Sequence, residues 1–595
     1  MKELWYVSCS PRNPAKIRNE VALLALLEGE KWNAKNSSGE HVIQLKFAKM
    51  LSQSGDFEGK AAGREMDFSA RDRVAPMKTY GFVYIDKDDK IIITKAGREL
   101  IKGEDEGHVF LMQMLKWQYP SVQHGGPEYQ DQPKTLFEPK KLGFNILPFI
   151  FTIQVAKKVD GLTKREIALF LLPHRQMISI SKVAAQIKKY RIARERQKGR
   201  VKKRTFDERI HRRLFKKIYA EYLARHKNLV ERNRELIKKV SNSRDVADAC
   251  IRLFRYTGIF ATQKDRLVLN DTRAEEIAVI LSRKWKPVDF YKDAKRFNTY
   301  FGDPGKPELP FFDPTFLIKK TLSLVKQIER EKANLPVEIK LEDAKLSVLT
   351  KLSKSELLKK IKELTNLYRT LSEKQLVNYL RSEKGQQDVL EFYDAIIHNE
   401  VADPASFFEW NTWRALIAID ESKEIIPNLI LDDSLRPIDC ARGNCPDMVA
   451  KFTDYVVAVE VTLTGGRRQY MTETEPVTFH VGRCQEEERT SGSQRKVYGL
   501  FIAPSVNKHA ANYFRQYISQ LEVPDYGNVT VIPVDLDTWK NILNFASSLG
   551  YLRDHALGDL LAAIEQSAST TQNVDGWLAS IPELIEIWKG QISTA

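Results

Sequence analysis

Two stretches of the chain, residues 69–100 and 243–277, share one pattern of hydrophobic and polar positions. In each, apolar residues at helical spacing are followed by two short β-rich runs around a charged turn, and then by a second helical stretch. We expect Ser69 and Ser243 to cap the first helix of each copy, and Pro76 to kink the first helix of the first copy. The pattern predicts helix, hairpin, helix, which is the layout of a winged helix. Winged helices either bind DNA or pack against other protein parts, and the pattern alone leaves both roles open.

A strongly basic segment lies between the two copies and directly precedes the second one. The whole chain carries a formal charge of +16, and residues 188–240 contain 21 Lys and Arg against 6 Asp and Glu, so this segment alone contributes 21 − 6 = +15. Its apolar residues recur at helical spacing and predict an amphipathic helix whose other face is basic: Ile210, Leu214, Ile218, Tyr222 and Leu223. Such a concentration of charge repels itself unless a polyanion neutralises it, so the segment favours nucleic acid over a purely solvated surface.

The rest of the pattern divides the chain into four predicted domains. Residues 161–172 predict a helix with Thr163 as its N-cap, and a helical stretch interrupted by Pro336 follows much later. From about residue 386 the composition changes, with alternating β-rich segments. The fold class expected is multidomain α+β: winged-helix recognition subdomains at the N-terminus, a helical linker, and a C-terminal α/β domain. The predicted boundaries are 1–150, 151–314, 315–385 and 386–595.

Composition excludes several classes of protein. Hydrophobic residues make up 43% of the 595 residues and aromatic residues 10%, which is enough to build packed cores. No apolar run approaches the ~20 residues that span a bilayer, and the first residues lack an apolar signal region. The five cysteines are odd in number and form no CxxC pair, so we expect reduced thiols and no structural zinc site. Together with the lack of a membrane-spanning run, this predicts a cytoplasmic protein of bacterial type that has no membrane partner.

Residues 446–462 carry the candidate chemistry. Two β-rich runs flank Thr453 and Asp454, and a hairpin turn at these two residues gives opposed positions that sum to 453 + 454 = 907. Asp447 then lies directly across from Glu460, on the same face of the sheet, with Cβ atoms about 4.5–5.5 Å apart. A symmetric four-residue loop gives the same pairing, whereas a three-residue loop would break it.

Two carboxylates held side by side repel each other, and the usual compensation is a divalent cation with oxygen ligands, here Mg²⁺. Such a site can activate water and stabilise the charge that develops on a phosphate. The alternative is an Asp that caps a turn and a Glu on the solvent face of a strand. Glu460, however, lies inside an otherwise apolar run. The spacing of Asp447 and Glu460 resembles the PD-(D/E)xK nuclease core, but Thr462 stands where that core usually has Lys.

Longer strings give a more specific resemblance. Over nearly the whole length the chain is similar to the AlwI-type family of type IIS restriction endonucleases, which includes strand-specific nicking enzymes. The strings that carry this resemblance are WYVSCSPR (5–12), RDRVAPMKTYGFV (71–83), KWQYPS (116–121), RDVADA (244–249), FEW (408–410), PDM (446–448), EVT (460–462), EPVT (475–478) and LFIAP (500–504). Members of the family also carry Thr after the Glu, so Thr462 does not argue against activity.

The resemblance implies a role for each matching residue. Asp447 and Glu460 match the metal-binding carboxylates, and the carbonyl of Val461 would be a further ligand. Catalytic roles also pass to three other side chains: Glu409, Glu473 and His480. Glu409 matches a helix carboxylate that points at the same site. Glu473 or His480 would supply the proton chemistry that Lys supplies elsewhere, with His480 able to donate near neutral pH. Mg²⁺ is the expected cofactor, with Mn²⁺ able to substitute.

The resemblance also implies how the parts work together. The N-terminal half would read a short asymmetric site in double-stranded DNA, and the C-terminal domain would cut a few base pairs downstream. Basic residues on or near the candidate recognition helices would hold phosphates or read guanine edges: Arg71, Arg73, Lys78, Arg244, Arg252 and Arg255. One active site cuts one strand, so a double-strand break would need a second copy or a small nuclease subunit, and a separate methyltransferase is expected. The alternative function is a sequence-specific DNA-binding regulator with an inactive nuclease-like domain.

Overall fold

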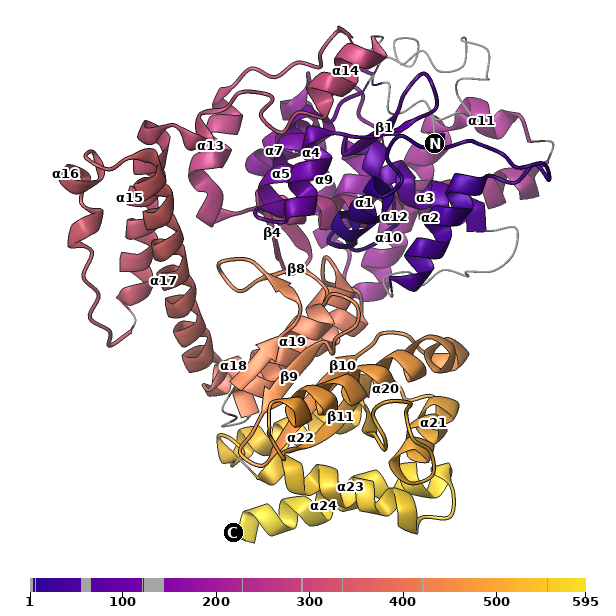
Figure 1. The fold of residues 1–595 in the computed structure, drawn as a ribbon, viewed down its shortest axis with the longest axis vertical. Coiled ribbons are helices and arrows are strands. Elements are labelled where there is room, and N and C mark those ends of the chain that lie inside the picture. The colour runs from indigo at the N-terminus through magenta and orange to yellow at the C-terminus, as the bar shows by residue number, and fades with distance from the viewer. Residues whose placement is uncertain are drawn as a thin grey trace. The chain divides into compact units, whose positions relative to one another are not determined.

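The computed structural model describes residues 4–594 apart from residues 6, 55–65, 120, 122–143, 227, 291–292, 334, 420–421, 423 and 554. The chain forms two units, each described by itself below (Figure 1). Unit 1 contains residues Met1–Leu324 and Glu342–Ile361, and unit 2 contains Val325–Leu341 and Lys362–Ala595. Among the described helices, none combines the length and the apolar character needed to cross a membrane.

Unit 1 is mainly helical and contains two short sheets. Its helices and strands are α1 (Lys16–Ala25), α2 (Val42–Gln53), α3 (Met66–Thr79), β1 (Val83–Ile85), β2 (Ile91–Ile93), α4 (Lys95–Lys102), α5 (Glu106–Lys116), α7 (Pro148–Val159), β3 (Leu162–Thr163), α8 (Lys164–Glu166), the π-helix η2 (Ile167–Leu171), α9 (Ile180–Glu195), α10 (Arg200–Ile218), α11 (Ala220–Ala224), α12 (Leu229–Tyr256), β4 (Phe260–Gln263), β5 (Arg266–Leu269), η3 (Asp271–Arg273), α13 (Ala274–Ser282), α14 (Ala294–Phe301), η5 (Pro310–Phe312), η6 (Glu342–Ala344) and α16 (Leu346–Leu349). Two helices have residues in both units, α15 (Pro314–Lys332) and α17 (Lys354–Leu380).

Both predicted helix–hairpin–helix copies are present. In the first, α3 is followed by the antiparallel pair β1–β2 and by α4; in the second, α12 is followed by the antiparallel pair β4–β5 and, after η3, by α13. Phe110 of α5 packs against Phe82 of the first copy and Tyr256 of the second, with ring centroids 5.0 Å away in each case. The two copies therefore share one aromatic core.

The predicted N-caps of these copies are wrong. Ser69 lies inside α3 and Ser243 inside α12, because both helices begin further upstream than the repeat pattern suggested. Leu236 and Val240 are buried on the same helix as Ser243, so the apolar face continues through it. The Ser243 hydroxyl donates to the Val240 carbonyl at 2.7 Å instead of capping a helix. Pro76 does lie within α3.

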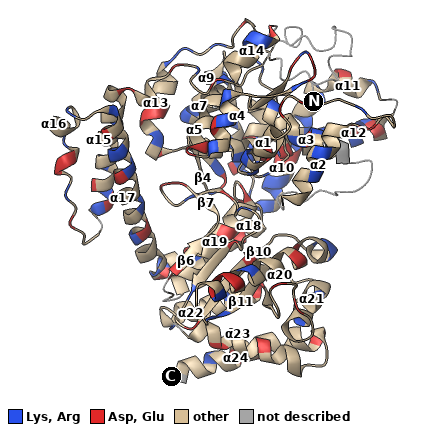
Figure 2. Cartoon of the chain, in the orientation of Figure 1, with Lys and Arg blue, Asp and Glu red and all other residues tan. Residues whose placement is uncertain are grey.

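The basic segment 188–240 forms parts of four helices, α9 to α12, rather than one continuous amphipathic helix. Gly199, with φ of +82°, separates α9 from α10, and Asn228 caps α12 by accepting from the Glu231 amide at 2.8 Å. Tyr190 and Phe206 of this segment form an apolar cluster with Leu169, and Ile210 and Leu214 pack against it. Lys and Arg recur along α10 (Figure 2), and most of these residues are exposed.

Two smaller predictions concern the neighbouring segments. Thr163 caps a helix as expected, and its partner Glu166 completes a capping box. The helix it begins is short, because residues 164–166 pass directly into the π-helix η2. The interrupted helical stretch is also present, with α15 ending at Lys332 and α17 beginning at Lys354 on either side of Pro336.

Unit 2 is built around a mixed five-stranded sheet with the strand order β12-β11-β10-β9-β6. Its elements are α18 (Glu383–Ile397), α19 (Pro404–Ile419), β6 (Glu424–Pro427), β7 (Ile430–Leu431), β8 (Pro437–Asp439), β9 (Met448–Lys451), β10 (Tyr455–Val461), α20 (Gly466–Thr490), β11 (Lys496–Ala503), α21 (Lys508–Ser519), β12 (Thr530–Asp535), α22 (Leu536–Leu549), α23 (Ala556–Thr570) and α24 (Val574–Thr594). Strands β10, β11 and β12 are parallel, and β9 and β6 are antiparallel to their neighbours.

Helices cover the sheet of unit 2 (Figure 1). Val456 and Ala458 of β10 share an apolar cluster with Val477 and Val481 of α20. Because side chains alternate along a strand, Glu460 continues the face of β10 that Val456 and Ala458 present to α20. The chain as a whole is a mixed α+β protein with more than one domain, as expected from the sequence.

Candidate active site

The β9–β10 hairpin has the predicted register. Its paired positions run from Val456 opposite Lys451 to Val459 opposite Met448, and each pair sums to 907. The next position in this register places Glu460 opposite Asp447, which directly precedes β9. The hairpin prediction is therefore confirmed, and the two carboxylates belong to neighbouring strand ends.

Asp447 is fixed from several directions. Its Oδ2 accepts a hydrogen bond from the backbone amide of Val461 at 2.8 Å, across the end of the hairpin. Its own carbonyl accepts from the amide of Asn428 at 3.0 Å, and the Asn428 side chain donates to the carbonyl of Pro446 at 2.7 Å. Two short contacts from the segment after β6 thus hold the Pro446–Asp447 peptide in place.

Glu460 and His480 meet across the sheet–helix interface. Glu460 is 8% exposed, near the end of β10. The Nδ1 atom of His480, on α20, lies 2.6 Å from Glu460 Oε1. His480 lies one residue before Val481, and Val477 and Val481 pack on the same face of β10 that carries Glu460, so the helix brings the ring to the carboxylate.

Glu409 and Glu473 complete the predicted set. Glu409 is buried on α19, which begins at Pro404 as the sequence indicated, and its Oε2 accepts from the Ala441 amide at 2.8 Å. Glu473 is half-exposed on α20 and accepts from the Thr472 hydroxyl at 2.7 Å. Its charge acts on both Asp447 and Glu460, but among the described contacts no hydrogen bond joins it to either.

The electrostatics show that these acids form one cluster. Burial raises the pKa of Asp447 well above its ordinary value, and the charge of Glu460 raises it further. Burial also raises the pKa of Glu460, with smaller contributions from Glu409 and then Glu473. The pKa of Glu409 is raised by burial and then by the charge of Asp447. Each carboxylate thus increases the cost of ionising the others.

The donor chemistry of this cluster fits a hard divalent cation. In the described residues, no Lys or Arg forms an ion pair with Glu409, Asp447 or Glu460, so their charges lack a protein counter-ion. The same residues include no group of three or more His, Cys, Asp and Glu side chains that could hold a metal ion. An ion at this place would therefore depend on two carboxylates and main-chain oxygen rather than on a complete cage of side chains.

His480 behaves differently from the expectation that it donates a proton near neutral pH. Burial and the nearby charge of Arg483 lower the pKa of His480 to about 4, so the ring is neutral at pH 7. Its contact with Glu460 is then a hydrogen bond from a neutral imidazole rather than an ion pair. The position is suited to orienting Glu460.

Thr462, the position where a Lys was missing, is buried at 9% exposure. Its hydroxyl oxygen accepts from the backbone amide of Thr464 at 3.0 Å, and its amide donates to the Ile502 carbonyl at 3.0 Å. The side chain therefore shapes the loop between β10 and α20 and supplies no charge to the site.

Two residues near the cluster were missed at the level of sequence. Arg483 lies three positions after His480 on α20, donates to the carbonyl of Asn444 at 3.2 Å, and lowers the pKa of His480. Asp439 is fully buried at the end of β8, and its charge raises the pKa of Glu409. The helical spacing of His480 and Arg483 was a usable signal, whereas Asp439 is brought close only by the fold.

The predicted DNA-contacting residues of unit 1 fall into two groups. Arg73 and Arg255 are buried, with Arg73 Nη1 2.9 Å from Glu20 Oε1, so neither presents its guanidinium to a duplex. Burial also lowers the pKa of Lys78. Arg71 is exposed, and Arg244 is 39% exposed and paired with Glu208 at 2.6 Å. Arg252 is nearly as buried as Arg73, with 11% of its side chain exposed, and it pairs with Asp248 at 3.0 Å.

Comparison with known proteins places this architecture. The family model described as AlwI restriction endonuclease matches residues 78–542. Among solved structures, the chain is similar to the small subunit (R.BspD6I2) of the heterodimeric restriction endonuclease R.BspD6I, with 24% identity and a TM-score of 0.27 over 34% of this chain and 98% of that one. It is also similar to the BpuJ1 endonuclease binding domain in complex with pyrene- and phenanthrene-modified DNA, with 16% identity and a TM-score of 0.31 over 48% of this chain and 90% of that one. The comparison with curated proteins gave no match. Because the family match covers most of the chain, including the β9–β10 hairpin and α20, the protein belongs to the AlwI restriction endonuclease family and is a site-specific deoxyribonuclease.

Proposed function

We propose that the protein is a type IIS endonuclease. Unit 1 binds a short asymmetric site in double-stranded DNA, and unit 2 hydrolyses a phosphodiester a few base pairs downstream. The observation that carries this proposal is the buried pairing of Asp447 with Glu460 in a family of DNA endonucleases. Among the described residues neither acid has a Lys or Arg partner, and two such acids are costly to keep inside a fold unless they serve a cation.

DNA binding by unit 1 is supported by its charge and by its two helix–hairpin–helix copies, which we interpret as winged helices. The segment 188–240 carries +15, and most of the Lys and Arg side chains of α10 are exposed. These side chains would contact phosphates and release counter-ions, which supplies affinity for any duplex. Base selectivity must come from other residues of the same unit.

Cleavage by unit 2 would use a PD-(D/E)xK-type site with Mg²⁺, or Mn²⁺ in its place. The residues that would hold the ion are Asp447, Glu460 and the carbonyl of Val461. When bound, the ion would polarise the scissile phosphate and make a bound water more acidic. His480 would keep the Glu460 carboxylate oriented through its 2.6 Å contact, and Glu473, half-exposed on α20, would accept a proton from the attacking water.

Whether one DNA strand or both are cut depends on the number of active sites. One such site cuts one strand, so the protein alone would nick DNA, and a double-strand break would require a second copy or a small nuclease subunit. A separate methyltransferase would protect the host DNA.

The test is incubation of the full chain with supercoiled plasmid and Mg²⁺ or Mn²⁺, followed by run-off sequencing of both strands. A single displaced cut on one strand of each site is expected, with no cut in EDTA. If neither metal supports cutting at any enzyme-to-DNA ratio, the proposed activity is rejected. A cut inside the recognised bases would reject the type IIS geometry alone.

A further inference from the structure

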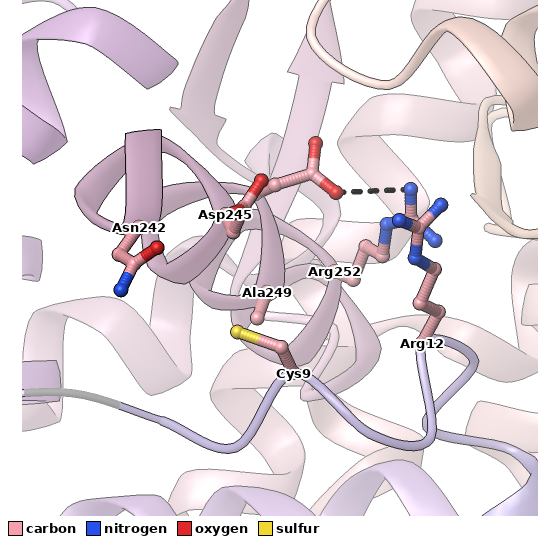
Figure 3. Close-up of a pocket in the computed structure, with 7 residues that line it drawn as sticks. Cys9, Arg12, Asn242, Asp245, Ala249 and Arg252 are labelled. Atoms are coloured by element: carbon pink, nitrogen blue, oxygen red, sulfur yellow. Dashed lines mark ion pairs between the residues drawn. The ribbon is translucent and has the colours of Figure 1, made fainter. Parts of the chain in front are cut away.

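Unit 1 contains a cavity of about 330 Å³ between its N-terminal segment and α12. Figure 3 shows Cys9 and Arg12 on one loop, next to Asn242, Asp245, Ala249 and Arg252 along a single helix. Of the side chains that line this cavity, Arg252 alone belongs to the set predicted from the sequence to contact DNA. The cavity is distinct from the carboxylate cluster of unit 2.

The loop that carries Cys9 and Arg12 is anchored on both sides. Before it, Trp5 is fully buried, donates its amide to the Leu172 carbonyl at 3.1 Å, and packs edge-on against Trp117 at 5.7 Å. After it, Asn13 is buried, and its Oδ1 accepts from the Ala15 amide at 2.8 Å. Arg12 is exposed between these two anchors, so the backbone presents its side chain from a fixed position.

The helix side of the cavity is equally well fixed. Asn242, Asp245, Ala249 and Arg252 follow one another at spacings of three or four residues, which places them on one face of α12. The opposite side of this helix is buried in the core of unit 1, through residues such as Val246, Ala247, Cys250 and Phe254. The cavity-facing side of α12 is therefore presented by a rigid element rather than by a loop.

Three of the lining side chains are left without a protein partner. In the part of the chain that the structure describes, no hydrogen bond or ion pair engages the side chains of Arg12, Asn242 or Asp245. Asp248 differs, because it pairs with Arg252 at 3.0 Å and with Lys164 at 2.9 Å. Arg12 thus presents donors, Asn242 a donor and an acceptor, and Asp245 an acceptor to whatever enters the cavity.

The charge of the cavity distinguishes it from the surrounding surface. The N-terminal part of the same helix belongs to the basic segment and carries exposed Arg234 and Lys238. The cavity instead combines Arg12 and Arg252 with Asp245 and Asp248, so its formal charge is balanced. The pKa of the Cys9 thiol is raised to about 11 by burial and by the charges of Asp245 and Asp248, so the thiol stays neutral.

A carboxylate in this place is informative, because it repels phosphate. Arg, Asn and Asp are the side chains that read base edges in the major groove: Arg reads guanine, Asn reads adenine, and Asp accepts from the amino group of cytosine. We propose that the cavity lined by Arg12, Asn242 and Asp245 receives base edges of the target duplex, with Asp245 accepting a hydrogen bond from an exocyclic amino group of a base. Arg234 and Lys238 contact phosphates nearby and set the register of α12 on the duplex. This inference rests on the proposed function and adds which residues select the sequence.

The test is sequence selection by the full chain in EDTA, so that binding is measured without cleavage. Randomised duplexes bound by the wild type, by Asp245→Asn, by Arg12→Ala and by Lys238→Ala are recovered and sequenced, and affinities are then measured on the preferred duplex and on a random one. Asp245 is exposed and unpaired, so the isosteric change is compatible with the fold. Thermal unfolding of each variant verifies this directly.

The proposal predicts three different results. Asp245→Asn should lose its preference at one position of the site and bind the preferred duplex about 10- to 100-fold more weakly, with unchanged or tighter binding to random duplex. Arg12→Ala should alter a different position. Lys238→Ala should weaken binding to every sequence and lower its salt dependence.

Two outcomes separate the inference from the proposed function. If the wild type shows a base preference and both Asp245→Asn and Arg12→Ala keep it unchanged, the cavity does not read bases and the inference is overturned, while the nuclease assignment stands. If the wild type itself shows no base preference, site-specific binding by unit 1 fails and the inference fails with it.

Discussion

Replacing Asp447 by Asn should abolish cleavage and at the same time stabilise the sheet of unit 2 when no divalent ion is present. The folded state raises the pKa of both Asp447 and Glu460, so each group contributes stability at low pH that is lost as the pH rises through its folded-state pKa. At a pH at which both carboxyl groups are ionised, the metal-free protein is therefore on the less stable side of both titrations. A neutral amide at position 447 removes one of the two repelling charges.

The size of the effect follows from the hairpin register. Directly opposed residues have Cβ atoms about 5 Å apart, and two charges at a comparable separation repel by about 3 kcal/mol at an effective dielectric constant of about 20. Against this, Asp447 Oδ2 accepts from the Val461 amide at 2.8 Å. An amide oxygen replaces that charged acceptor at a cost of about 1 kcal/mol. The net gain expected for Asp447→Asn is about 2 kcal/mol.

Hydrogen exchange of the β10 amides measures this locally, because exchange in a core strand reports the free energy of opening. In EDTA, peptides that cover Tyr455–Val461 should exchange about 30-fold more slowly in Asp447→Asn than in the wild type. Added Mg²⁺ should protect the wild type and leave the variant unchanged. Plasmid cleavage in Mg²⁺ should be lost in the variant, while binding to the preferred duplex in EDTA is kept.

Asp454→Asn is the matched control, because the same change is made at the other end of the same hairpin. Asp454 is 68% exposed and lies 3.3 Å from His555, which is 63% exposed, so its replacement should alter neither exchange nor cleavage. If Asp447→Asn exchanges as fast as the wild type in EDTA, the two carboxylates do not repel each other in the fold, and if it still cuts DNA, they do not form the cleavage site.

Three further predictions concern other parts of the protein. His480→Ala should reduce the cleavage rate about 10- to 100-fold and raise the Mg²⁺ concentration required, because Glu460 loses the group that orients it, and an unchanged rate and Mg²⁺ requirement would contradict that role. Replacing Arg212 and Arg213 of α10 together by Ala should weaken binding to random duplex and lower the slope of log affinity against log salt by about 1 to 2, and an unchanged slope would show that this face does not meet DNA. Burial lowers the pKa of Lys116 to about 7, so above that pH the unfolded chain binds a proton that the folded chain does not. The free energy of unfolding of unit 1 should therefore rise by about 1.4 kcal/mol for each pH unit between about 7.5 and 9. Urea unfolding of Lys116→Met should lack this dependence.

The local parts of the candidate site were predictable from sequence. Thr453 and Asp454 sit between two β-rich runs, and a two-residue turn fixes which residues face each other; the structure has that register. The helix that carries Glu409 was indicated by Asp403–Pro404, and it begins at Pro404. These predictions succeeded because each depends on neighbours within about ten residues of the chain.

The remaining parts depend on contacts between distant segments. Arg73 and Arg255 are of the residue type that reads guanine and lie on candidate recognition helices, but the packing of unit 1 buries both. Arg73 pairs with Glu20, which is far away in sequence. The neutral state of His480 follows from burial against the sheet rather than from any local pattern. Ser243 was mistaken for an N-cap because a Ser before apolar residues at helical spacing is typical of a helix start. The same pattern also occurs inside a longer helix whose apolar face continues through the Ser.

The register of the β9–β10 hairpin also has a consequence for how the protein tolerates insertions. Surface turns usually accept extra residues with little penalty. A single residue inserted between Phe452 and Tyr455 would either bulge locally or slide β9 by one position, and sliding would turn Asp447 to the opposite face of the sheet from Glu460. Although this turn is at the far end of the hairpin from the carboxylates, its length determines whether Asp447 and Glu460 lie on the same face of the sheet. A tag or linker placed there is a poor choice for engineering this enzyme.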